Sequence, residues 1–290
     1  MFFWNELTTE EFKALDSDSA VAILPIAATE QHGPHLPVST DSAIAAGMLS
    51  VLREQLPPDL QVLVLPIQEI GRSHEHMARR GTLTQASTRL VEDWCEIGAG
   101  VARAGLRKLV IVNSHGGNVP VMDIVARELR IAHKMLVVTT QWNRFGVPGG
   151  LFDAEELRFG IHAGAVETSL MLHFRPDLVR MEHARNFVSA AAAMEREFTH
   201  LRPTGPHGMG WIVGDLNEYG AVGNALAGNA EKGAAVAHHQ VAGFIALLKD
   251  AVKFDVGRFD QPPELRVVNT AQRPSVNHRI ANGSSEWNGR

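Results

Sequence analysis

The chain has 290 residues and a formal net charge of −5, with 45% apolar and 20% charged residues. This length allows a sizeable core, and the acidic balance gives no electrostatic reason to expect nucleic acid or an anionic membrane as a partner. No run of about 20 apolar residues occurs, so we expect no membrane span. The single cysteine, Cys95, cannot form an internal disulfide, and the N-terminus lacks a signal-peptide pattern. We therefore expect a cytoplasmic protein.

Short apolar runs alternate with amphipathic stretches along the chain. The runs predict strands at 20–26, 61–65, 108–112 and 134–139, and the amphipathic stretches predict helices at 41–55, 87–104, 120–132, 164–174 and 230–252. Such alternation is typical of an α/β fold with a mainly parallel sheet. No linker divides the first part of the chain, so we expect one domain over residues 1–257 and a polar C-terminal tail over 258–290.

Three polar segments begin where a predicted strand ends. They cover residues 30–41, 69–76 and 113–118, after the first, second and third strands. Ligands bind at the carboxyl ends of the strands in an open parallel sheet. The topology is therefore expected to bring these distant segments together.

The first segment contains Glu30, His32 and Asp41. Glu30 and His32 are two residues apart, so both side chains project to one side of an extended stretch. Glycine and prolines then bend the chain and let Asp41 return to the same point. One imidazole and two carboxylates suit a cation such as Zn²⁺, Mn²⁺ or Fe²⁺. The alternative is that Asp41 caps a helix and the other two are solvated.

Two later segments offer further ligands. His115 lies in Asn-Ser-His-Gly-Gly-Asn directly after a strand, although a phosphate-binding loop is the alternative for this glycine pair. His162 and Glu167 are five residues apart with small residues between them, which lets both face one pocket. A solvated helix start is the alternative there.

Together these segments resemble the creatininase (creatinine amidohydrolase) family. The matching motifs are Glu-Gln-His-Gly-Pro-His at 30–35 with Asp41, the loop 71–76 leading to Gly-Thr-Leu at 81–83, the loop 113–118, and His-Ala-Gly-Ala-Val-Glu-Thr-Ser at 162–169. The resemblance covers roughly residues 4–250, with the motifs in the same order.

The resemblance implies a single three-layer α/β domain with two divalent metal ions per chain (Zn, with Mn or Fe possible), assembled as a homohexamer. It implies that Asp41 bridges the metals, that Glu30 and His115 complete one of them, and that His32 with another carboxylate completes the other. Creatininase has a glutamate where this chain has Gly117. We expect Glu167 to supply that missing carboxylate.

The implied activity is hydrolysis of a non-peptide amide or cyclic amide C–N bond in a small molecule by a hydroxide bound between the metals. The leaving nitrogen needs a proton, and His162 is the candidate acid. His74 or His76 could act instead, and His76 is also a candidate substrate contact. Relatives in the family act on formamides and peptide ends too, so a deformylase or a peptidase is an alternative.

Substrate selection is assigned to Trp142 and Arg158. Trp142 matches the first of two tryptophans that frame the flat substrate of creatininase, whereas Arg158 replaces the second. Because an arginine pairs with carboxylates or phosphates, this replacement predicts an anionic amide rather than creatinine. Arg158 could equally be a surface residue. Two alternatives outside hydrolysis are a catalytically silent metal-bound binding protein and a nucleotide-binding module.

Overall fold

A computed structural model describes residues 2–260. Its residues 2–256 form one compact unit, and a second unit begins at Gly257. Most of the predicted C-terminal tail therefore lies outside the described residues. No helix in the described part of the chain is long and apolar enough to cross a membrane.

The first unit is built on a four-stranded sheet in the order β2-β1-β3-β4, in which all the neighbours are parallel. A short antiparallel pair, β5 with β6, lies apart from it. The strands are β1 (Val21–Ile26), β2 (Val62–Val64), β3 (Lys108–Asn113), β4 (Leu136–Gln141), β5 (Asn186–Phe187) and β6 (Gly223–Asn224). The predicted α/β class with a mainly parallel sheet is confirmed.

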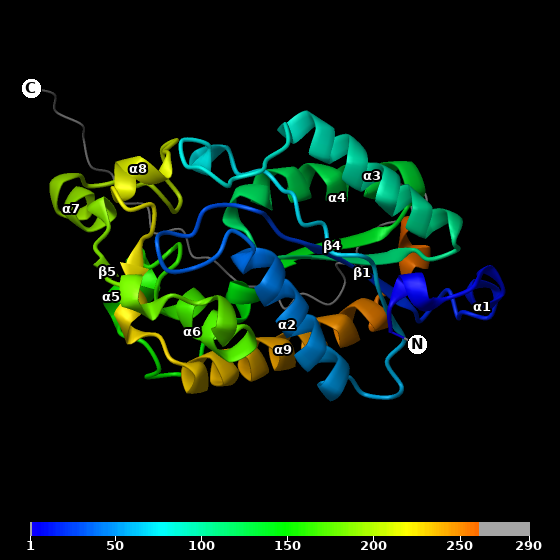
Figure 1. Ribbon diagram of the computed structural model, residues 1–290. Helices are drawn as coiled ribbons and strands as arrows, with labels where there is room; N and C mark the ends of the chain where they lie inside the picture. The colour runs from blue at the N-terminus through cyan, green and yellow to red at the C-terminus, as the bar shows by residue number, and fades with distance from the viewer. Residues whose placement is uncertain (1, 261–290) are drawn as a thin grey trace, which may run out of the picture. The chain divides into compact units, whose positions relative to one another are not determined.

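Helices cover both faces of this sheet (Figure 1). The helices of the described chain are α1 (Thr9–Lys13), α2 (Thr40–Gln55), α3 (Ser87–Arg103), α4 (Val119–His133), α5 (Ala154–Phe159), α6 (Ala165–Phe174), α7 (Ala190–Glu197), α8 (Val213–Leu216) and α9 (Ala230–Lys253). Helices α3 and α4 pack on one face, and α2, α6 and α9 pack on the other.

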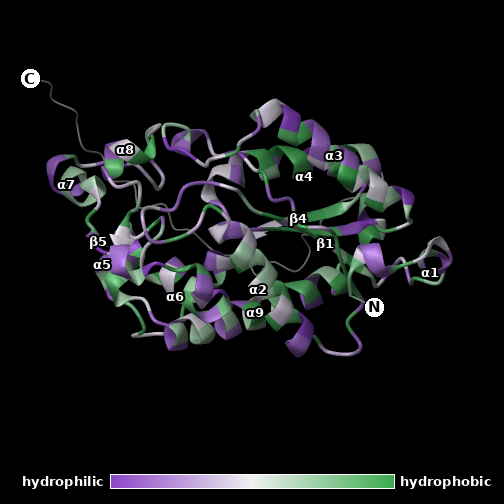
Figure 2. Cartoon of the chain, in the orientation of Figure 1, coloured by the Kyte–Doolittle hydropathy of each residue, from purple (hydrophilic) through white to green (hydrophobic). Residues whose placement is uncertain are grey.

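The strands alternate their side chains between two apolar cores. In β3, Val110 and Val112 belong to the core under α2 and α9, whereas Leu109 and Ile111 belong to the core under α3 and α4. Figure 2 shows hydrophobic strands beside helices that carry both hydrophobic and hydrophilic residues. Burial on both faces explains why the strand sequences are continuous apolar runs, as expected for a covered parallel sheet.

Strand β4 begins two residues later than the sequence pattern predicts. Helix α4 runs to His133, and Lys134 then takes a left-handed conformation with φ of 52° at its C-cap. This turn moves the start of the strand to Leu136. The other predicted strands and helices match the structure to within two residues at each end.

Candidate metal centre and cleft

The polar segments meet at the carboxyl ends of the sheet strands. Glu30 and His32 follow β1, the loop containing His76 follows β2, and His115 follows β3. The first turns of α2 and α6 add Asp41 and Glu167. The structure thus gathers the five predicted metal ligands into one cluster, as the strand order leads us to expect.

One part of this cluster joins Glu30, Asp41 and His115, whose ligand atoms could together hold a metal ion. The Nδ1 atom of His115 lies 3.1 Å from Glu30 Oε1 and 3.4 Å from Asp41 Oδ2. All three side chains are buried. A nitrogen facing two carboxylates at these distances leaves room for a cation between them.

The other part of the cluster joins His32, Asp41 and Glu167. The Nε2 atom of His32 lies 3.1 Å from Asp41 Oδ1 and 3.9 Å from Glu167 Oε2. Asp41 therefore presents one oxygen to His32 and the other to His115. This arrangement fits a carboxylate shared by two metal ions.

The hydrogen bonds of the two histidines leave one nitrogen of each ring directed into the cluster. His32 donates from Nδ1 to the backbone oxygen of Glu30 at 3.0 Å, and His115 donates from Nε2 to that of Arg72 at 2.8 Å. A carbonyl oxygen only accepts, so the other nitrogen of each neutral ring carries a lone pair. Backbone anchoring of this kind orients a histidine toward a metal.

Buried atoms without hydrogen-bond partners support a metal in this place. Both carboxylate oxygens of Glu30, the Nε2 of His32 and the Oδ2 of Asp41 lack such partners among the described residues. Polar atoms this deeply buried normally have a partner, and unpaired buried charge is costly. The donor set of imidazoles and carboxylates suits Zn²⁺ or Mn²⁺, so the residues present fit two divalent ions.

In the metal-free chain, protons balance the charges of the cluster. Burial alone would lower the pKa of both imidazoles, but Asp41, Glu167 and Glu30 raise the pKa of His32 to about 9. Glu30, Asp41 and Glu75 raise the pKa of His115 to about 10. Burial raises the pKa of Glu167 to about 7. Burial also opposes ionisation of Glu30, yet His115, His162 and His32 keep its pKa well below the usual value.

These shifts predict that metal binding releases protons. At pH 7, His32 and His115 are protonated in the metal-free chain, and a metal must displace a proton from each. The apparent affinity for Zn²⁺ is therefore expected to rise with pH until the pH exceeds about 10, the pKa of His115. Titration with Zn²⁺ in a weakly buffered indicator solution measures the released protons, and His115→Ala should release fewer. An affinity that does not change between about pH 6 and 8 would contradict this linkage.

Two further histidines, His76 and His162, lie beside Glu30 and line the same cleft. His162 donates from Nε2 to the backbone oxygen of Gln31 at 2.9 Å, which leaves a lone pair on Nδ1, 3.7 Å from Glu30 Oε1. Burial, together with His32 and His76, holds the pKa of His162 well below its usual value. The ring is therefore neutral near pH 7, with the lone pair of Nδ1 unprotonated. The same nitrogen could also complete a metal site with Glu30 and His32.

Gln31 sets the proton position of His76, a role that the sequence did not reveal. The Gln31 side-chain oxygen accepts from the Gly33 amide at 3.1 Å, so its amide nitrogen donates to His76 Nδ1 at 2.7 Å and to the Gly220 oxygen at 2.7 Å. His76 then carries its proton on Nε2, 3.5 Å from Glu30 Oε1. His76 and His162 thus offer a donor and an acceptor. His74 also lines the cleft, but it is exposed.

A strained turn holds Glu167 in place. Ala163 takes a left-handed conformation with φ of 56°, and its amide donates to Glu167 Oε2 at 2.6 Å. The buried Glu156 supports the same turn, because Oε1 accepts from the Ala165 amide and Oε2 from the Asn224 amide, both at 2.6 Å. Backbone strain of this kind clusters at functional sites. No motif in the sequence pointed to Glu156.

The structure explains why no side chain stands at position 117. A Cβ on Gly117 would lie 2.3 Å from both Glu75 Oε1 and the Arg72 oxygen, closer than real atoms approach. The Glu75 carboxylate occupies this space and lies 3.8 Å from His115 Nε2. That nitrogen faces away from the cluster, whereas Glu167 lies on the cluster side, next to His32. Glu167 is thus better placed to replace the missing ligand.

This geometry predicts different metal contents for two matched variants. Glu167→Gln is expected to bind less metal than the wild type, because a neutral amide is a weaker ligand than a carboxylate. Glu75→Gln, which makes the same change on the far side of His115, is expected to keep the metal content of the wild type. Elemental analysis after equilibrium dialysis measures the metal-to-protein ratio. The reverse pattern would assign the ligand to Glu75.

Two residues expected to contact substrate lie elsewhere in the structure. Trp142 follows β4, and its indole packs against Phe244 of α9 in the core, with ring centroids 4.8 Å apart. Its neighbours Gln141 and Asn143 line the cleft instead. The strand ends at Gln141, and a 3-10 helix over Trp142–Phe145 follows, in which the indole faces α9 rather than the cleft.

Arg158 also lies away from the cluster. Its guanidinium pairs with Glu195 of α7, and its side chain is 61% exposed. Glu156, two positions earlier in α5, is buried, and a helical turn of about 200° over two residues directs Arg158 outward. In this arrangement Arg158 does not line the cleft over the cluster.

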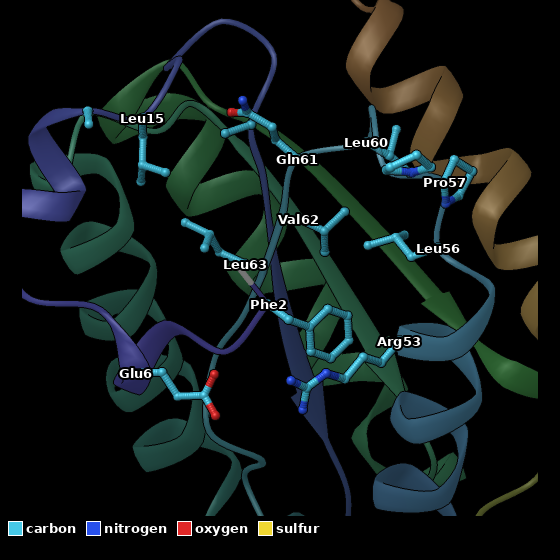
Figure 3. A pocket seen from close by; sticks show the side chains of 13 residues that line it. Phe2, Glu6, Leu15, Arg53, Leu56, Pro57, Leu60, Gln61, Val62 and Leu63 are labelled. Carbon is cyan, nitrogen blue, oxygen red and sulfur yellow. The ribbon is translucent and has the colours of Figure 1, made fainter.

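Glu30 and His115 of the cluster, together with His76 and His162, line a cleft of about 930 Å³. A separate cavity of about 520 Å³ lies at the amino ends of β1 and β2, beside Phe2 and Val62 (Figure 3). Its described lining contains only Glu6 and Arg53 as ionisable residues, so it offers no comparable ligand set. The cleft over the cluster is therefore the candidate active site.

The family model for creatininase, described as creatinine amidohydrolase, matches residues 5–248. The chain belongs to the creatininase family. A mycofactocin precursor peptide peptidase from Mycobacterium tuberculosis is 30% identical over 254 residues, covering 86% of this chain and 89% of the relative. A protein of the same description from Mycolicibacterium smegmatis is 34% identical over 177 residues, covering 60% and 66%.

The chain is also similar to creatinine amidohydrolases. The Pseudomonas putida enzyme is 31% identical over 200 residues, covering 62% of this chain and 74% of the relative. A crystal structure of creatininase superposes with a TM-score of 0.70 at 25% identity, covering 87% of this chain and 98% of the other. The expected creatininase fold is confirmed.

Proposed function

We propose that this chain is a metal-dependent hydrolase that cleaves an amide or cyclic amide C–N bond in a small molecule. The observation that carries the proposal is Asp41, whose two oxygens face His32 and His115 at 3.1 and 3.4 Å. Glu30, His32, Asp41, His115 and Glu167 would hold two divalent ions, for which Zn²⁺ is the first candidate and Mn²⁺ or Fe²⁺ the others. Other creatininase structures are described as Zn–Zn and Mn forms, which supports this choice.

When bound, the two metals supply a water that is nucleophilic at neutral pH and polarise the amide carbonyl. The residues of the chain move the protons. His162 takes a proton at Nδ1 as water attacks and returns it to the leaving nitrogen, which departs as an amine. The Nε2–H of His76 faces the same space and can donate a hydrogen bond to the carbonyl oxygen as it gains charge. The backbone oxygen of Gln31 keeps the His162 ring oriented throughout.

The test of this proposal is an amide screen on metal-loaded protein. The screen comprises creatinine, other cyclic amides, linear amides, formamides and short peptides, with release of amine or acid as the readout. Activity that is lost on chelation and restored by Zn²⁺ or Mn²⁺ is expected. Tight metal binding without turnover of any compound would favour a catalytically silent binding protein.

A second candidate is a peptidase that acts at a peptide end. Two observations favour it: the cleft of about 930 Å³ is at the upper end for small-molecule sites, and the mycobacterial relatives above are described as peptide peptidases. The peptide arm of the same screen separates it from the first candidate. A homohexamer is also part of the proposal, and light scattering of the purified protein would check it. A cytoplasmic location is proposed as well.

A further inference from the structure

The lining of the cleft combines polar and apolar residues. The polar residues include Glu30 and His115 of the cluster together with Arg72, His74 and Glu75. Six lining residues from three parts of the chain are apolar, and we call them the apolar wall: Val119, Pro120, Ile161, Met209, Trp211 and Ile212. The last three belong to the segment before α8, which no sequence motif had singled out.

Part of this apolar wall is open to solvent. The Ile212 residue is 49% exposed and Ile161 is 38% exposed, although both line a concave site. Single exposed apolar side chains are common, but several that share a cleft mark a surface that a ligand covers. Trp211 is partly buried, because it also packs against Val213, Leu216 and Val222.

The segment that carries these residues is held in position by hydrogen bonds. The Met209 amide donates to the Arg202 oxygen at 2.9 Å, and the Ile212 amide donates to Asp215 Oδ2 at 2.9 Å. The packing of Trp211 on the small core below fixes the centre of the segment. The apolar wall is thus formed before a ligand arrives, which reduces the entropy lost on binding.

Away from the proposed metal ions, the cleft offers no free cation to an acidic side chain. Arg72 is the arginine in the lining, and its guanidinium pairs with Glu75 at 3.2 Å. An acidic side chain that lies beside the apolar residues would therefore find no unpaired arginine in this lining.

We propose that Met209, Trp211 and Ile212 form a subsite for an apolar side chain of the substrate. This inference rests on the proposed amide hydrolysis and specifies its substrate class. The substrate is an amide, of dipeptide size or slightly larger, that carries an aliphatic or aromatic side chain next to the scissile bond. The amide lies over the cluster while the side chain covers the apolar wall.

Matched amides test this substrate class. The probes are the N-formyl, N-acetyl and N-glycyl derivatives of phenylalanine, serine and aspartate, given to the full-length, metal-loaded protein. The phenylalanine member of each series is expected to exceed the aspartate member in kcat/KM by about 10- to 100-fold, since one buried aromatic group contributes that much. Equal values across a series, or a preference for aspartate, would overturn the proposal.

Variants test whether the preference for apolar substrates arises at the apolar wall. Trp211→Ala is expected to raise KM for the phenylalanine substrate by about 10-fold and to leave the serine substrate nearly unchanged, while Trp211→Phe keeps the preference. Ile212→Ser provides a second test, because this side chain is half exposed and its loss should not disturb folding. Leu226→Ala is the control, since Leu226 is 60% exposed outside the cleft lining. Equal losses on both substrates in Trp211→Ala and Ile212→Ser would contradict a subsite at this wall.

Binding is measured separately from turnover. Isothermal titration of the same compounds reports the apolar preference even where no compound is cleaved. Tighter binding of the phenylalanine members without hydrolysis would support the subsite and contradict the proposed function. Hydrolysis without any apolar preference would support the function and contradict the subsite.

Discussion

Asp41→Ala is expected to lose both metal ions and to reduce turnover by about 10³-fold or more, because Asp41 faces both histidines of the cluster. Each metal would lose an oxygen ligand that no other residue supplies from the same position. The remaining ligands, Glu30 with His115 and His32 with Glu167, would hold their ions through two contacts each. The measurements are metal content by elemental analysis and kcat/KM on the best amide from the screen.

The melting temperature provides a readout that does not depend on activity. Metal bound to the folded chain stabilises it by mass action, so chelation should lower the melting temperature of the wild type. The Asp41→Ala variant is expected to melt at the same temperature with or without chelator. Asp123→Ala, which removes an exposed carboxylate from α4, is the control and should behave as the wild type does. Retention of two metals in Asp41→Ala would contradict the bridging role, and retention of one would make Asp41 a ligand of a single ion.

His162→Ala is expected to keep both metal ions and to reduce kcat by about 10²- to 10⁴-fold, the usual range for a group that transfers a proton. The structure supports this role through the free Nδ1, which lies 3.7 Å from Glu30 while Nε2 is engaged with the Gln31 backbone. Metal content, kcat and KM are measured together. A loss in kcat with little change in KM would fit proton transfer rather than substrate binding.

Two outcomes would assign His162 differently. A parallel loss of metal and activity would make it a ligand, in keeping with its position beside Glu30 and His32. Unchanged activity would move the proton transfer to another histidine of the cleft. His74→Ala is the matched control, since His74 lines the same cleft but is exposed and lies on the loop after β2. Partial rescue of His162→Ala by added imidazole would separate lost chemistry from lost structure.

The sequence by itself determined the fold class and the position of the cluster of candidate metal ligands. Apolar runs of strand length, separated by amphipathic helices, leave a covered parallel sheet as the arrangement that buries them. Polar residues directly after those runs must then meet at one edge of the sheet. Glu30, His32, Asp41 and His115 could be identified for this reason, because strand ends and local spacing fix where their side chains start.

Only the tertiary structure decided what surrounds that cluster. Trp142 and Arg158 were matched by position, but the 3-10 helix after β4 places the first against Phe244 in the core, and the turn of α5 directs the second toward Glu195. Glu75 fills the space beside Gly117 through a contact between loops 42 positions apart in sequence. Trp211 reaches the cleft from a segment with no motif at all. Side-chain direction and long-range contacts depend on how elements pack, and local sequence patterns do not specify them.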